Sequence, residues 1–80
     1  MSVMVEGYSR ISIDPQQMNG QACIRGMRLT VRRVLELLPS YPDWSQLLTD
    51  YPELEREDIV EALRFAAQSL DDQVIVHRAA

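Results

Sequence analysis

Residues 30–70, TVRRVLELLPSYPDWSQLLTDYPELEREDIVEALRFAAQSL, decide the fold because they hold three apolar stripes at helical spacing. Thr30 is a favourable N-cap for the first predicted helix. Asp43, followed three residues later by Gln46, predicts a capping box at the start of the second. Prolines end the first two helices. The expected helices cover residues 31–38, residues 44–51 and about residues 56–70.

Each predicted helix has one apolar face, and we expect the three faces to share a core. The stripes are Val31, Val34, Leu35 and Leu38; Trp44, Leu47, Leu48 and Tyr51; and Ile59, Leu63, Ala66, Ala67 and Leu70. The acidic residues at the start of the third helix are interpreted as helix N-terminal charge on a solvated face.

The segments on either side of the helices predict strands. Residues 8–13 alternate and are rich in β-branched side chains, and residues 22–24 offer a second short strand before a bend at Gly26. The apolar tail, residues 73–77, predicts a third strand if it finds an edge, and residues 8–13 are one candidate partner. The expected fold is therefore mainly α, of the α+β class: two or three short strands plus a three-helix, helix-turn-helix-like core.

The expected organisation is an N-terminal extension at 1–7, one winged or helix-turn-helix-like domain at 8–70, and a tail at 71–80. Eighty residues lie near the lower limit for a core that is stable alone, so we expect a homodimer or a covering partner. No apolar run could span a membrane, and the start, MSVMVEGYSR, does not resemble a signal peptide, which favours the cytoplasm.

The inventory of reactive side chains argues against catalysis. His77 is the only histidine and Cys23 the only cysteine, so neither a Ser-His-Asp triad with an oriented base nor a cysteine-based zinc site is expected. No glycine-rich phosphate loop is present. We expect a binding module that has no enzymatic activity, metal or cofactor, with Cys23 as a small buried residue.

The charge is unevenly distributed. The net charge is −4, but residues 1–40 carry five arginines against three acids, and residues 41–80 carry three arginines against nine acids. Every basic side chain apart from the histidine is arginine, whose planar guanidinium can bind a carboxylate or a phosphate through two hydrogen bonds. A partner could therefore complement either half of the chain.

Four segments resemble the bacterial family catalogued as domain of unknown function 433. They are Arg10-Ile-Ser-Ile-Asp-Pro15, the segment from Asn19 through Cys-Ile-Arg-Gly-Met-Arg-Leu-Thr to Val31, Tyr51-Pro-Glu-Leu-Glu-Arg-Glu-Asp-Ile59, and Glu61-Ala-Leu-Arg-Phe-Ala66. Together they span about residues 8–70 in the family's order and spacing. This chain departs from the pattern at Gln21-Ala22, where relatives have lysine-proline, and at Met27, where they have threonine.

The resemblance implies a homeodomain-like helix-turn-helix fold and a role as an antitoxin of the VapB kind, encoded beside a PIN-like ribonuclease toxin. Such nucleases hold catalytic metals with clustered acids. An arginine of the antitoxin placed there would displace the metal and block RNA entry.

The candidate partner-binding arginines are Arg25, Arg28, Arg32 and Arg33. One interpretation is a solvated positive face with Arg28 in a structural ion pair, and the other is a site for the carboxylates of a partner. Further candidates are Phe65, interpreted either as packed under the strands or as part of an interface, and the tail residues Val74 and Val76, which could add to a sheet edge.

Two other functions stay open. The chain could be a DNA-binding regulator of its own operon, but the third helix would bring acids to the major groove, which disfavours DNA. Any DNA contact would then come from the same four arginines, and DNA binding by the isolated domain is expected to be weak. The other is a structural or scaffold module without a toxin.

Overall fold

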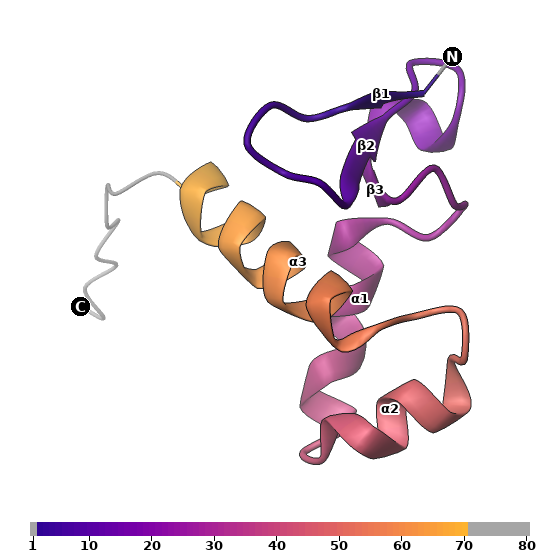
Figure 1. Ribbon diagram of the computed structural model, residues 1–80, viewed down its shortest axis with the longest axis vertical. Helices are drawn as coiled ribbons and strands as arrows, with labels where there is room; N and C mark the ends of the chain where they lie inside the picture. The colour runs from indigo at the N-terminus through magenta and orange to yellow at the C-terminus, as the bar shows by residue number, and fades with distance from the viewer. Residues whose placement is uncertain (1, 71–80) are drawn as a thin grey trace, which may run out of the picture.

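The computed structural model describes residues 2–70 and has the α+β architecture expected (Figure 1). A small antiparallel sheet of order β1-β2-β3 lies at one end of the molecule, and α2 lies at the other (Figure 1). α1 and α3 pack together between them. The predicted tail strand, with Val74 and Val76, lies outside the described residues.

The sheet begins earlier in the chain than the sequence indicates. β1 (Val3–Met4) pairs with β2 (Ile11–Ile13), which pairs with β3 (Ala22–Ile24). Part of the expected N-terminal extension is therefore a strand. The predicted strand over residues 8–13 is wrong in its first half, because the chain turns through Gly7 and forms its ladder only from Ile11. β2 is therefore the central strand of the sheet, with β1 and β3 paired to its two edges.

A tight turn follows β3. Arg25 and Gly26 have positive φ, 43° and 74°, and the N–H of Met27 donates to the carbonyl of Ile24 at 2.7 Å. Positive φ at both central residues is the pattern of type I′ turns, and the bend expected at Gly26 is confirmed. The turn is closed by a bridge between Cys23 and Thr30, so α1 starts directly beneath the sheet.

The helices begin close to their predicted positions. α1 (Val31–Leu37) is capped by Thr30, whose hydroxyl accepts from the N–H of Arg33 at 3.0 Å. Before α2 (Trp44–Asp50), Asp43 accepts from the N–H of Ser45, and Gln46 donates to Asp50, so the capping box predicted there is wrong. The capping box is found at α3 (Arg56–Ser69), between Glu55 and Asp58. Two 3-10 turns complete the elements, η1 (Met18–Gly20) and η2 (Leu38–Ser40).

The core lies where α1 and α3 meet the sheet. Its buried apolar side chains are Tyr8, Ile11, Ile24, Val31, Val34, Leu37, Leu47, Leu54, Ile59 and Ala62, and Cys23 is also buried. The predicted stripe of α3 is wrong at Leu63 and Leu70, which are 40% and 73% exposed, and at Ala67, which is also exposed. α3 instead buries Asp58 beside Ile59, because two arginines neutralise that carboxylate.

Phe65, which is not part of the predicted apolar stripe of α3, packs against the core. Its ring meets the ring of Tyr8 edge-on, with centroids 5.4 Å apart, and the Tyr8 hydroxyl donates to Gln68. The contact with Tyr8, which lies between β1 and β2, supports the interpretation of Phe65 as a packed residue. No described helix is long and apolar enough to cross a membrane.

Candidate partner-binding site

Asp58 is a fully buried carboxylate at the first turn of α3. Arg25 donates to both of its oxygens, Nε to Oδ1 at 3.0 Å and Nη2 to Oδ2 at 2.9 Å. Arg10 donates to Oδ1 at 3.1 Å, and the N–H of Glu55 donates to Oδ2 at 2.8 Å. Every lone pair of this carboxylate faces a donor, which is the condition under which a buried charge is tolerated.

The two arginines extend this cluster to its neighbours. Arg10 also pairs with Glu55 at 2.6 Å, and its N–H donates to Glu61 at 2.9 Å. Arg25 donates to the carbonyl of Glu53 at 2.7 Å. We call Arg10, Arg25 and Asp58 the arginine clamp. The clamp ties the sheet and its turn to α3, so the guanidinium of Arg25, predicted to bind a partner, is engaged within the chain.

The clamp also sets the protonation of Asp58. Burial by itself raises the pKa of this carboxyl group, but the hydrogen bonds from Arg25, the backbone of Glu55 and Arg10 outweigh burial and lower the pKa below its ordinary value of 3.8. The hydrogen bond to Asp58 in turn raises the pKa of Arg25. The clamp is fully charged near neutral pH.

The other three predicted arginines lie together and face solvent. Arg28, Arg32 and Arg33 line a hollow of about 330 Å³ that we call the arginine pocket. The rest of its wall is Met18, Gln21, Leu29, Thr30 and Glu36. Arg32 and Arg33 approach Glu36 at 3.4 and 3.7 Å with mostly exposed side chains, so these pairs are weak and leave both cations accessible. Within residues 2–70, Arg28 has no ion-pair partner, so the interpretation that places Arg28 in a structural ion pair is wrong. The structural ion pair is made by Arg25, with Asp58.

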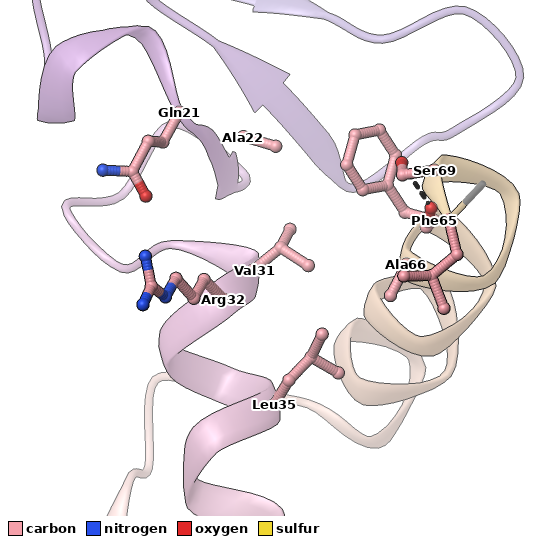
Figure 2. Close-up of a pocket in the computed structure, with 9 residues that line it drawn as sticks. Gln21, Ala22, Val31, Arg32, Leu35, Phe65, Ala66 and Ser69 are labelled. Carbon is pink, nitrogen blue, oxygen red and sulfur yellow. Dashed lines mark hydrogen bonds between the residues drawn. The ribbon is translucent and has the colours of Figure 1, made fainter. Parts of the chain in front are cut away.

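A second hollow, of about 340 Å³, lies on the neighbouring face of α1, between α1 and the last turns of α3. We call it the apolar groove. Its lining is Gln21, Ala22, Val31, Arg32, Leu35, Phe65, Ala66, Ser69 and Leu70. Figure 2 shows Val31 and Leu35 pointing toward α3, whereas the guanidinium of Arg32 points away, to the side of Gln21. Both hollows share Gln21 and Arg32.

The cations of α3 are engaged within the chain. The guanidinium of Arg56 lies over the ring of Trp44, 4.8 Å from its centroid, and that of Arg64 lies 5.0 Å from the centroid of Tyr8. Arg64 also donates to the carbonyl of Gly7 at 3.3 Å. Exposed acids, among them Glu57, surround the start of the same helix. Both arginines of α3 are thus engaged in contacts within the chain, beside exposed acids that would repel a polyanion.

Comparison with known families finds one family model that matches, described as protein of unknown function (DUF433), over residues 11–66. The chain belongs to this family. No curated protein and no solved structure matches the chain. The DUF433 segment contains the whole arginine pocket and the clamp residues from Arg25 onward, whereas Arg10 and the rim residues Ser69 and Leu70 lie outside it.

In this DUF433 domain the structure brings together three of the four predicted arginines and places Phe65 on the wall of the adjoining groove. Sequence reasoning missed the clamp and the groove. Asp58 was interpreted, with the other acids at the start of this helix, as charge on a solvated face, and that interpretation is wrong because its carboxylate is fully buried. Its position directly before Ile59, the first residue of the predicted apolar stripe, was a signal for a buried ion pair. No signal of this kind marks the groove, which forms only when α1 and α3 pack. No set of acidic, histidine or cysteine side chains in residues 2–70 is arranged to hold a metal.

Proposed function

We propose that the chain is a type II antitoxin that binds and neutralises a cognate PIN-like ribonuclease. The observation that carries this proposal is the arginine pocket: Arg28, Arg32 and Arg33 lie together beside α1, and no described residue provides any of them with a buried partner. A guanidinium binds a carboxylate in a planar, two-point arrangement. The clustered acids that hold metal in a PIN-like nuclease are such carboxylates, and an arginine there would exclude both metal and RNA.

A DNA-binding regulator of the same operon is the second candidate. In a helix-turn-helix domain the leading residues of α3 would approach base edges, and the likeness of α2 and α3 to that motif stays a prediction. The exposed acids at the start of α3 and the internal engagement of Arg56 and Arg64 favour a protein partner over DNA. A scaffold module without a toxin is the third candidate.

The test is co-expression of the full chain with the reading frame beside its gene. We expect the two proteins to co-purify and the chain to restore growth that the partner alone arrests. Single changes of Arg28, Arg32 and Arg33 to Gln should weaken rescue for at least one position, because each removes one two-point carboxylate contact. Arg56→Gln, on the opposite part of the chain, is the matched control and should rescue fully. Full rescue by all three pocket variants, or no complex with the wild-type chain, would reject the proposal.

A further inference from the structure

Two parallel rows of side chains run along α1. Val31 and Leu35, four residues apart, form an apolar row on the wall of the groove. Arg32 and Glu36, also four residues apart, form a charged row one residue further round the helix, on the wall of the arginine pocket. The two hollows share Gln21 and Arg32, so the apolar row and the charged row line adjoining parts of one surface.

Within residues 2–70, the apolar side of this surface is left open. Leu70 is 73% exposed at the rim, and Phe65 and Ala66 are only partly buried along the groove. Apolar side chains left open between two helices are the usual receptor for the apolar face of a third helix. The seven residues of α1 make about two turns, so the two rows extend over roughly 10 Å.

We propose that the apolar groove and the arginine pocket form one docking surface for an amphipathic, acidic helix of the ribonuclease partner. Leu or Ile side chains of that helix fill the groove, and Asp or Glu side chains on its flank reach Arg28, Arg32 and Arg33. This inference rests on the proposed function and names the part of the partner that the site recognises.

Charge complementarity selects this occupant. The arginine pocket holds three arginines and one glutamate, a balance of +2. A second copy of this chain placed across a two-fold axis would bring the same arginines to the same surface, so like charges would oppose it. A nucleic acid would meet the arginines with phosphates but has no aliphatic row for the groove. A helix with adjoining apolar and acidic rows satisfies both halves.

The experiment measures the dissociation constant of the complex between the full chain and its co-expressed partner, and compares three variants. Leu70→Ser, at the end of α3, and Leu35→Ser, in α1, remove apolar contacts from the groove. The control Leu63→Ser removes an exposed leucine of α3 that lies outside the groove. We expect Leu70→Ser and Leu35→Ser to weaken binding about tenfold. Leu63→Ser should leave the dissociation constant within twofold. Circular dichroism verifies that each variant is folded.

Hydrogen exchange of the partner then identifies what docks. Protection of a helix with an aliphatic row beside Asp or Glu residues is the expected result, and its charge-reversed variant should lose binding. If the wild-type complex forms and neither groove variant weakens it, the docking surface is rejected while the antitoxin function stands. If no complex forms, both are rejected. Protection of a basic or extended segment of the partner would also overturn the docking proposal. So would sedimentation of the free chain as a dimer that the Leu70→Ser change converts to a monomer.

Discussion

Asp58 links α3 to the sheet, because its carboxylate forms ion pairs with two arginines. Arg10 lies directly before β2, and Arg25 lies in the turn after β3. The residue is fully buried, so a neutral or truncated side chain would leave two guanidiniums without their shared counter-charge. Positive φ at Arg25 is tolerated because the same turn directs its side chain to this carboxylate.

Asp58→Asn should lower the free energy of unfolding by about 3 kcal/mol, because it removes the charge while keeping the volume of the side chain. Urea denaturation followed by the fluorescence of Trp44 measures the loss. Glu57→Gln, an exposed acid one residue earlier in the same helix turn, is the control and should change stability by less than about 0.5 kcal/mol.

The difference in the free energy of unfolding between the wild-type chain and Asp58→Asn should depend on pH. The pKa of Asp58 is lower in the folded chain than its ordinary value of 3.8, so the stabilisation is complete above pH 4 and is lost as the pH falls through the lower, folded value. The gap between the wild-type chain and Asp58→Asn should therefore narrow below pH 4. A gap that stays constant from pH 7 to pH 3 would show that charge on Asp58 contributes nothing.

At the scale of the elements, the short helices depend on their ends. α1 has only seven residues, too few to be stable as an isolated helix, so its cap and its packing must hold it. Thr30 supplies the cap and also forms the bridge to Cys23. A loosened start of α1 would displace Arg32 and Arg33 together, because both lie in its first turn.

Thr30→Ala should destabilise the fold by about 1 kcal/mol, the usual cost of losing an N-cap hydroxyl. Thr30→Ser keeps the hydroxyl and should recover most of that loss in the same urea titration. Equal stability of the alanine and serine variants would mean that the cap hydrogen bond does not hold α1.

The elements could be predicted from the sequence because local signals decide them. Thr30 and the prolines place the helices within a residue or two, and Gly26 marks the turn. The clamp could not be predicted, because it joins residues 33 and 48 positions apart and only the folded backbone brings them together. The buried face of α3 was misjudged for the same reason: periodicity selected Leu63, whereas the clamp turned Asp58 inward.

At the scale of the whole molecule, positive and negative charges occupy different places. The accessible arginines gather beside α1, and the start of α3 carries exposed acids. The net charge of −4 opposes general association with nucleic acids, while the local positive surface attracts carboxylates or phosphates at short range. The expected homodimer remains a prediction.

We expect the isolated full chain to bind a duplex from its own promoter weakly, with a dissociation constant of roughly 10 µM or higher at physiological salt. Fluorescence anisotropy of labelled DNA measures it, with a salt titration. Arg28→Gln should reduce whatever binding is seen, and Arg56→Gln should not. Nanomolar binding that depends on Arg56 or Arg64 would instead assign DNA recognition to α3.

The long reach of the clamp also sets the order in which a newly made chain can assemble. Arg10 and Arg25, which flank β2 and β3, are synthesised first, but their counter-charge on Asp58 arrives 48 residues after Arg10. Gln68, the acceptor for the Tyr8 hydroxyl, comes 60 residues after its donor. The hairpins therefore cannot be locked while the ribosome is still making α3. Folding of this domain is delayed until α3 has been made, and a nascent chain that lacks α3 has no apolar groove.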